Sequence, residues 1–145
     1  MDELLRIARR PAVTTHPGAT VRQVCEQMMA EKVGAVVVVD GDRLVGMFSE
    51  RDVVARVVVA RLDPDVTPVS QVMTRDVTTA SAGMTEDQAV SLMHHGHFRH
   101  LPLVDPAGRV VATLSVRHLL KHRVDALDMR NHDLVAYISA DGPGG

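Results

Sequence analysis

The chain has 145 residues, of which 46% are hydrophobic and only 2% aromatic, and its formal net charge is −2. This length is enough to bury a core, which must be mainly aliphatic. The few aromatic residues and the lack of a basic excess argue against a nucleic-acid-binding protein. A single cysteine, Cys25, excludes an internal disulfide and a cysteine-based zinc site.

The pattern in chain order begins with a short amphipathic helix within residues 1–9 and continues as a β-α-β-β-α series. A β-branched strand is predicted at 12–15, and Thr20 is the expected N-cap of an amphipathic helix that ends with a glycine stop near Gly34. The next strand, 35–39, is apolar on consecutive residues, as expected when both faces are buried. A turn at 40–42 leads to a partner strand at 44–48, and a helix at 50–61 closes the series.

The same order of elements follows a second time. A strand is predicted at 76–79, and Thr85 is the expected N-cap of a helix that ends near Gly96. A buried strand at 100–104 is joined by turn residues to a partner at 110–114, and a helix follows at 116–123. Residues 124–138 continue with helical spacing of apolar side chains.

The second series repeats the first in sequence at an offset of 64 to 66 residues. Val13-Thr14-Thr15 returns as Val77-Thr78-Thr79, and Gly46-Met47-Phe48-Ser49 returns as Ala112-Thr113-Leu114-Ser115. Such a constant register indicates an internal duplication. We therefore predict an N-terminal helical segment (1–11), a first domain (12–62), a linker with the strand that leads into the second copy (63–75), a second domain (76–123), a C-terminal helix (124–140) and a disordered tail (141–145).

The longest apolar run, 35–39, is too short to span a bilayer, and the N-terminus lacks the apolar segment of a signal peptide. These features predict a cytoplasmic protein without a membrane partner.

Two motifs make the duplicated chain resemble a pair of CBS domains. Gly46-Met47-Phe48-Ser49-Glu50-Arg51-Asp52 is similar to that family's Gly-x-x-Ser/Thr-x-x-Asp/Asn signature. Phe98-Arg99-His100-Leu101-Pro102-Leu103-Val104-Asp105 is similar to its recurrent Arg-x-x-Pro-hydrophobic-Val-Asp run. Val72-Met73-Thr74-Arg75 is similar to the start of a second CBS domain. The resemblance implies an α/β (α+β) fold of tandem β-α-β-β-α domains related by a pseudo-two-fold axis. It also implies a homodimer and clefts that in many members hold AMP, ADP, ATP, NAD or S-adenosylmethionine.

Ser49 and Asp52 are the main candidates for binding such a ligand. Ser49 ends a predicted strand and Asp52 lies in the first turn of the next helix, where a carboxylate can accept hydrogen bonds from both ribose hydroxyls. Free amides at the helix start favour a nearby phosphate. The alternative is that both residues only cap the helix.

The remaining candidates come mainly from the resemblance. It implies an adenine slot formed by Val13, Thr14, Ala35 and Val36 with Met47 beneath; these positions also fit a plain core. Cations for the phosphates would come from Arg51, Arg99, His100 and Arg117, for each of which a solvated surface role is the alternative. Pro102 belongs to the second motif.

The second copy departs from the signature, because Ala112 replaces Gly46 and His118 replaces Asp52 beside the retained Ser115. A neutral histidine has one acceptor nitrogen and cannot accept hydrogen bonds from a diol as a carboxylate does. This second site is therefore empty, binds another ligand, or meets a phosphate through His118.

Eight histidines are a surplus for this length, and His118 and His122 lie four residues apart on a predicted helix. This spacing is a weak metal-site pattern without a third ligand. We found no phosphate loop, nucleophile elbow or other catalytic motif, and we expect no enzyme and no required cofactor. The sequence favours a regulatory protein that binds an adenine nucleotide and acts on another protein. The alternatives are a scaffold protein with vestigial clefts and a metal-responsive protein that uses its histidines.

Overall fold

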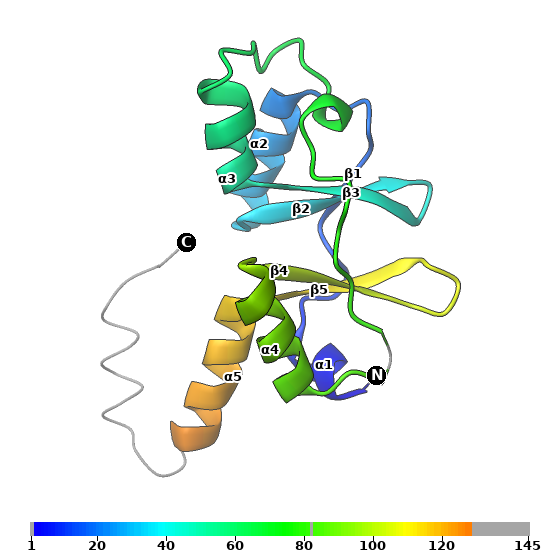
Figure 1. Cartoon of the computed structure of the whole chain (residues 1–145), viewed down its shortest axis with the longest axis vertical. Helices are drawn as coiled ribbons and strands as arrows, with labels where there is room; N and C mark the ends of the chain where they lie inside the picture. The colour runs from blue at the N-terminus through cyan, green and yellow to red at the C-terminus, as the bar shows by residue number, and fades with distance from the viewer. Residues whose placement is uncertain (1, 82, 129–145) are drawn as a thin grey trace.

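The computed structural model describes residues 2–81 and 83–128. Two α/β units are stacked with their small sheets face to face and their helices on the outer sides (Figure 1). The first unit contains β1 (Thr14–Thr15), α2 (Val21–Glu31), β2 (Ala35–Asp40), β3 (Arg43–Ser49), α3 (Glu50–Asp52) and the π-helical η1 (Val53–Val58). The second contains α4 (Glu86–Gly96), β4 (His100–Val104), β5 (Val110–Ser115) and α5 (Val116–Asp128). The duplicated α/β fold is confirmed.

Strand β2 occupies the centre of the first sheet. It pairs in parallel with β1 and antiparallel with β3, with Ala35 opposite Ser49. Val36 and Val38 belong to the core beneath α2, while Ala35 and Val37 pack between the two sheets with Met47. The strand is thus buried on both faces, as its continuous apolar sequence predicts.

The predicted strand at 76–79 is wrong, because these residues form no strand. Thr74, two residues before this segment, still pairs with Met47 of the first unit, through backbone hydrogen bonds of 2.8 and 2.9 Å. The chain then crosses to the second sheet and reaches it only at Ala80, which pairs in parallel with Leu103. The crossing segment therefore runs between two sheets and has no continuous strand partner.

Helices α2 and α4 begin at the predicted N-cap residues, Thr20 and Thr85. The Thr20 hydroxyl accepts a hydrogen bond from the Gln23 amide, and the Gln23 side chain accepts one from the Thr20 amide. Thr85 and Gln88 form the same reciprocal cap on α4. This arrangement satisfies backbone donors that the helix itself leaves unpaired.

Helices α2 and α4 end where predicted, near 32–34 and near Gly96, but glycine does not provide the stop, since the left-handed residues that end them are Lys32 (φ 56°) and His97 (φ 57°). Gly96 has a packing role instead: a Cβ atom there would lie 2.1 Å from Cε1 of the Phe98 ring. Glycine at the last helical position therefore lets the Phe98 ring lie against the helix end.

The two closing helices differ from each other. In the first unit, the predicted helix 50–61 divides into α3 and the wider π-helical η1. In the second unit, α5 is regular and continues past 123 to Asp128. The remainder of the predicted C-terminal helix (129–140) and the predicted tail (141–145) lie outside the described residues.

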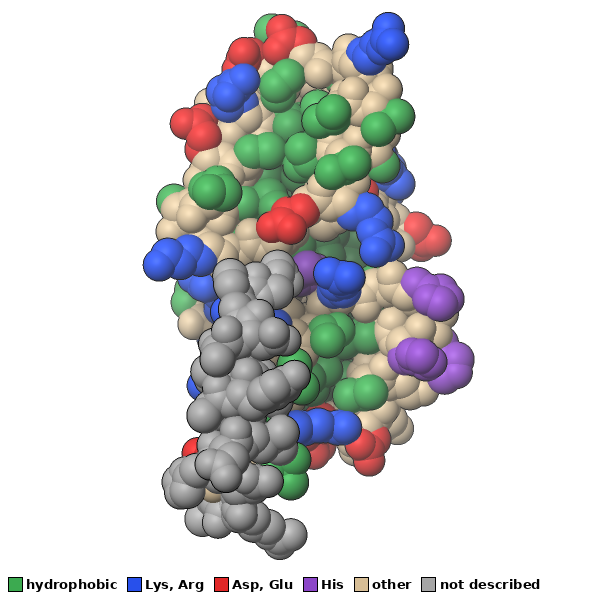
Figure 2. All heavy atoms as spheres, turned by 90° about the vertical axis from the view of Figure 1, so that its left-hand side faces the viewer, with side chains coloured by type: hydrophobic (Ala, Val, Ile, Leu, Met, Phe, Trp, Pro, Cys, Tyr) green, Lys and Arg blue, Asp and Glu red, His purple; other side chains and the backbone are tan. Residues whose placement is uncertain are grey.

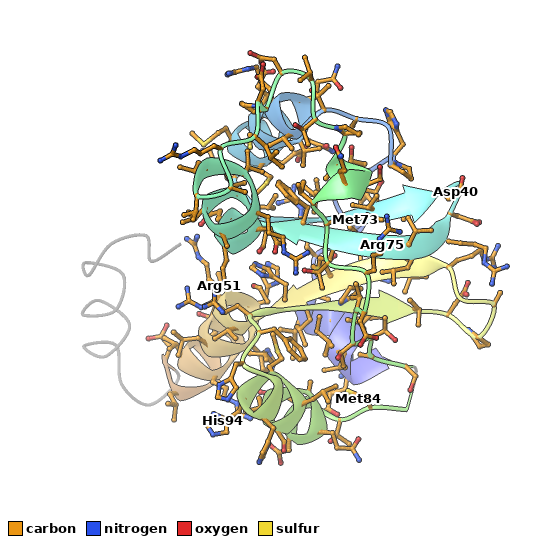
Figure 3. All side chains as sticks on the ribbon, turned by 45° about the horizontal axis from the view of Figure 1, so that its top comes forward. Asp40, Arg51, Met73, Arg75, Met84 and His94 are labelled. Atoms are coloured by element: carbon orange, nitrogen blue, oxygen red, sulfur yellow. The ribbon has the colours of Figure 1, made fainter. Side chains whose placement is uncertain are left out.

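Each unit has its own core. Phe48 is the largest fully buried side chain of the first, and Leu101 and Leu114 lie at the centre of the second. Helix α1 (Asp2–Ile7) packs on the second unit through the buried Leu4, although it precedes the first in sequence. The linker contains a 3-10 turn, η2 (Val69–Gln71), and Met73 and Arg75 follow it alongside the first sheet (Figure 3). Within 2–81 and 83–128, none of the helices has the length and apolar character needed to cross a membrane.

Candidate functional site

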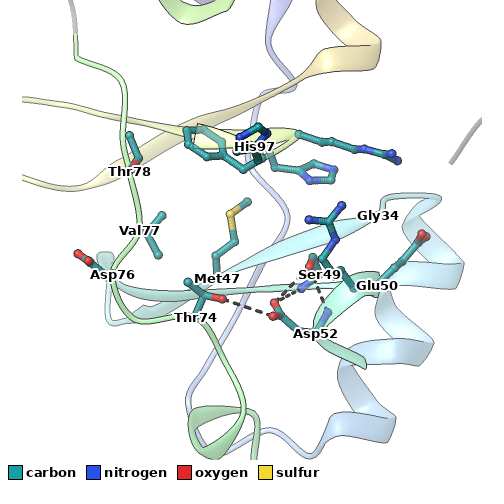
Figure 4. A pocket seen from close by; sticks show the side chains of 14 residues that line it. Gly34, Met47, Ser49, Glu50, Asp52, Thr74, Asp76, Val77, Thr78 and His97 are labelled. Atoms are coloured by element: carbon teal, nitrogen blue, oxygen red, sulfur yellow. Dashed lines mark hydrogen bonds between the residues drawn. The ribbon is translucent and has the colours of Figure 1, made fainter. Parts of the chain in front are cut away.

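A pocket of about 300 Å³ opens between the two units, next to the start of α3 (Figure 4). Five segments contribute to it: Gly34 between α2 and β2, the end of β3, the first turn of α3, the crossing segment around 74–78, and the chain from the end of α4 to the start of β4. Its lining residues are Gly34, Met47, Ser49, Glu50, Arg51, Asp52, Thr74, Asp76, Val77, Thr78, His97, Phe98, Arg99 and His100. The sequence candidates Met47, Ser49, Arg51, Asp52, Arg99 and His100 are therefore brought together at one cavity.

Ser49 and Asp52 form a reciprocal helix cap at the wall of this pocket. The Ser49 amide and hydroxyl both donate to Asp52 Oδ2, at 3.0 and 3.1 Å, and the Asp52 amide donates to Ser49 Oγ at 3.4 Å. The capping role that the sequence offered as an alternative is thus present. It occupies one carboxylate oxygen and leaves the other for a different partner.

Within the part of the chain that the structure describes, Asp52 Oδ1 has only long contacts. Thr74 Oγ1 donates to it at 3.4 Å, and Arg56 Nε lies 3.6 Å away. Hydrogen bonds to a carboxylate are normally 2.5–2.9 Å, so these contacts leave acceptor capacity in Oδ1. Because the Asp52 side chain is only 14% exposed, a hydroxyl that reached Oδ1 would bind a largely desolvated carboxylate.

The positive charge at the pocket comes from arginine. Arg51 and Arg99 are exposed side chains at its edge, and Arg51 lies between the two units (Figure 3). Burial, the nearby His118 and Arg99 lower the pKa of His100 to about 4. His100 is therefore neutral at pH 7 in the free protein, which disfavours it as a cation for the phosphates. Arg117 is exposed and lies outside the pocket lining.

Of the five candidates for the adenine slot, four do not line the pocket: Val13, Thr14, Ala35 and Val36. Val36 is fully buried against the helices, and Val13 packs on the same core, so both side chains contribute to the core, and their part in the expected adenine slot stays a prediction. Ala35 packs between the sheets. The Thr14 carbonyl accepts a 2.7 Å hydrogen bond from Gln27 Nε2. Of this group only Met47 reaches the cavity, because its side chain points from β3 toward the second sheet.

The candidates in the second copy lie elsewhere. Pro102 is fully buried in β4. The Ser115 amide donates to His118 Nδ1 at 3.1 Å, and the His118 amide donates to Ser115 Oγ at 3.0 Å. His118 thus replaces Asp52 as a capping acceptor, and this bond requires an unprotonated Nδ1. Burial, Arg9 and Arg117 lower the pKa of His118, in agreement with a neutral ring.

The weak metal pattern gains no third ligand. His118 Nδ1 is occupied by the cap, and His122 Nε2 lies 3.8 Å from Glu86 Oε2. Across 2–81 and 83–128, no three His, Cys, Asp or Glu side chains are grouped so that they could hold a metal ion.

Sequence reasoning missed one wall of the pocket, formed by the crossing residues Thr74, Asp76, Val77 and Thr78. The signal was present, since Val77 and Thr78 are the repeat equivalents of Val13 and Thr14. The sequence predicts Val13 and Thr14 of the first repeat beside the signature residues Ser49 and Asp52. In the structure the crossing segment places Val77 and Thr78 of the second repeat there. Gly34, Glu50, His97 and Phe98 complete the wall and were also missed.

These features define a duplicated α/β pair with a ligand-sized pocket at the junction of its two sheets. The family model of the CBS domain matches the chain twice, over residues 4–59 and 69–125. The chain therefore belongs to the CBS domain family.

Three known proteins illustrate the similarity. The CBS domain-containing protein CBSCBSPB2 of Arabidopsis thaliana is 34% identical over 125 residues, which are 86% of this chain and only 23% of that protein. The crystal structure of the CBS-domain containing protein ATU1752 from Agrobacterium tumefaciens is 33% identical, with a TM-score of 0.75 over 84% of this chain and 96% of that one. The CBS domain protein PAE2072 from Pyrobaculum aerophilum, complexed with AMP, is 28% identical, with a TM-score of 0.74 over 80% of this chain and 88% of that one.

Proposed function

We propose that the protein is a regulatory module that binds one adenine nucleotide (AMP, ADP, ATP or NAD) in the pocket beside Ser49 and Asp52. The observation that carries the proposal is Asp52 itself, a nearly buried carboxylate with one weakly engaged oxygen at the wall of a 300 Å³ cavity. The AMP complex of the similar Pyrobaculum protein supports an adenosine ligand. The ligand would change the relative stability of two conformations and so alter affinity for a protein target.

In this arrangement Asp52 Oδ1 accepts from the ribose hydroxyls, while Oδ2 keeps the helix cap. Met47, Val77 and Phe98 offer an apolar wall for the base, and Arg51 and Arg99 lie where phosphates could extend toward solvent. We propose no catalytic step.

A thermal-shift panel with AMP, ADP, ATP, NAD, NADH and S-adenosylmethionine tests the proposal. A ligand at 100 times its Kd adds about 2.7 kcal/mol of stability, or a rise in Tm of about 8 °C. Asp52→Asn should abolish most of this rise, because the amide can still accept the cap hydrogen bonds but attracts the diol weakly. Asp87→Asn, a first-turn carboxylate of α4 that binds Arg123, is the matched control. A panel without any shift, or a full shift in Asp52→Asn, contradicts the proposal.

The two pocket arginines should matter only for ligands that carry phosphate. We expect Arg51→Gln combined with Arg99→Gln to weaken ATP binding about tenfold, since each exposed ion pair contributes up to about 1 kcal/mol. Adenosine binding should not change. Calorimetric titration at low and high salt measures both effects, and equal losses for adenosine and ATP would show that the arginines act on the fold instead.

We further propose that the protein is a homodimer that associates through its helical side. On the helices of the first unit, Met29, Val54 and Val58 are 80%, 59% and 65% exposed. Val59 and Leu62, directly after η1, are 70% and 40% exposed, and Figure 2 shows hydrophobic side chains together on this side. On α5, Val116, Leu120 and Leu127 are 43%, 51% and 47% exposed, and Leu120 is the repeat equivalent of Val54. Apolar faces at equivalent helices of both units suit a two-fold contact between copies.

Val58→Asp should therefore convert the dimer to a monomer, because it places a charge in the apolar contact. Val66→Asp, at a linker valine that is 72% exposed, is the control that adds the same charge elsewhere. Light scattering coupled to size-exclusion chromatography measures the mass of each. A monomeric wild-type protein, or a dimeric Val58→Asp variant, would show that this surface is not a dimer contact.

A further inference from the structure

Arg56 connects two parts of the pocket wall without lining the pocket itself. Its Nη1 donates to the carbonyl oxygens of Val72 and Met73, at 3.3 and 2.9 Å. Its Nε lies 3.6 Å from Asp52 Oδ1. One guanidinium thus faces both the candidate ribose acceptor and the backbone of the linker, and its planar, fixed arrangement of donors suits such simultaneous contacts.

The linker contact closes a ring of interactions around Asp52. Thr74, which follows Met73, donates its hydroxyl to Asp52 Oδ1 and pairs its backbone with Met47 on β3. From Thr74 the chain continues as the pocket wall through Asp76, Val77 and Thr78. The position of this wall relative to the carboxylate therefore depends on contacts that Asp52, Arg56 and Thr74 share.

The second unit lacks this arrangement among its described residues. The repeat equivalents of Asp52 and Arg56 are His118 and His122. His118 accepts the cap hydrogen bond, and His122 faces Glu86 on α4 instead of a chain segment between the units. Arg56 also belongs to the π-helical η1, whereas α5 is a regular helix. Since π-helical turns occur often at functional sites, this difference favours a special role for the first unit.

We propose that Arg56 is a positioning residue of the pocket: it holds Asp52 Oδ1 toward a bound ribose and couples that carboxylate to the segment 72–78 between the two units. The inference rests on the proposed nucleotide function. Binding of a diol to Asp52 would then restrain the connecting segment, and loosening of that segment would weaken binding by the same factor.

The experiment compares AMP with 2′,3′-dideoxy-AMP by calorimetric titration. Wild type should bind AMP at least about tenfold more tightly, since hydrogen bonds to a charged group are involved. Arg56→Gln should reduce this preference to about twofold by weakening AMP alone. Arg75→Gln is the matched control. Arg75 Nη2 donates to the Ser70 carbonyl at 2.9 Å in the same linker and, among the described residues, Arg75 does not contact Asp52, so its loss should leave the preference intact. An unchanged preference in Arg56→Gln overturns the inference.

Hydrogen exchange gives an independent readout of the coupling. The amides of Met73 and Thr74 donate to the carbonyls of Val69 and Met47. AMP should slow their exchange in wild type and in Arg75→Gln but not in Arg56→Gln, and equal protection in all three overturns the coupling. If wild type binds no AMP, the proposed function fails. Hydrogen exchange in the ligand-free protein then tests the role of Arg56 separately. Faster exchange at the Met73 and Thr74 amides in Arg56→Gln, with no further increase when Asp52→Asn is added to it, supports the positioning role of Arg56. Unchanged exchange in Arg56→Gln refutes that role.

Discussion

Gly46→Val is expected to destabilise the protein by about 3 kcal/mol, the upper range for inserting bulk into a packed site. A Cβ atom at Gly46 would lie 2.4 Å from Met73 Sδ and 3.0 Å from the Thr74 carbonyl oxygen. The Met73 side chain can move, but the Thr74 carbonyl is held by the Met47 amide at 2.9 Å. The added side chain must therefore push the linker away from β3.

Gly83→Val is the control, because a Cβ atom at Gly83 meets no atom within 4 Å. Urea denaturation of both variants measures the difference in unfolding free energy. If Gly46→Val is as stable as Gly83→Val, the linker does not pack on β3 as described. The repeat equivalent of Gly46, Ala112, is fully buried in the second core, so this position admits a side chain there.

Stability should fall steeply as the pH drops from about 6.5 to about 4. His100 has its pKa lowered from 6.5 to about 4 by burial first, then by His118 and Arg99. Between these values the unfolded chain binds a proton at this residue and the folded chain does not, so unfolding is favoured increasingly as the pH falls. The loss is absent above about pH 7 and reaches about 3 kcal/mol near pH 4.

His100→Gln should flatten this part of the stability profile, because glutamine does not titrate. Denaturation at several pH values between 4 and 7 measures the slope. His95→Gln, at an exposed position near the end of α4, is the control and should keep the wild-type slope. A His100→Gln profile parallel to that of wild type would contradict a depressed pKa at His100.

The local features of the fold follow from short-range patterns. Thr20 with Gln23 and Thr85 with Gln88 form caps that the sequence indicates at the threonines. The apolar run at 35–39 becomes a strand covered on both faces, because it lies between helices and a second sheet. These outcomes depend on side chains that are neighbours in the sequence, so periodicity and capping chemistry are sufficient to predict them.

The contacts between the two copies did not follow from the same patterns. The segment 76–79 has the composition of a strand, yet the pairing of Thr74 with Met47 keeps it between the sheets. The α3–η1 division was also missed, because the helical pattern of 50–61 does not distinguish α from π hydrogen bonding.

The candidate site shows the same contrast between residues in a contiguous motif, which the sequence identified, and residues whose role depends on long-range contacts, which it did not. Ser49, Arg51, Asp52 and Met47 were found because the signature is contiguous. Val36 was assigned both to the core and to the ligand, and its place on β2 turns its side chain toward the helices, which accounts for the first of these roles. Thr74 and Arg56 escaped notice because their importance depends on a contact across the linker, which one sequence does not reveal.

The central claim is that the pocket beside Asp52 binds a nucleotide, whereas the equivalent position of the second repeat, with His118, does not. The most direct test is calorimetric titration of AMP into wild type, Asp52→Asn and His118→Asn. The account predicts one AMP per chain for wild type, loss of most affinity in Asp52→Asn, and unchanged binding in His118→Asn, whose amide oxygen can replace Nδ1 as the capping acceptor. Two AMP per chain, or binding that is lost in His118→Asn and kept in Asp52→Asn, would contradict it.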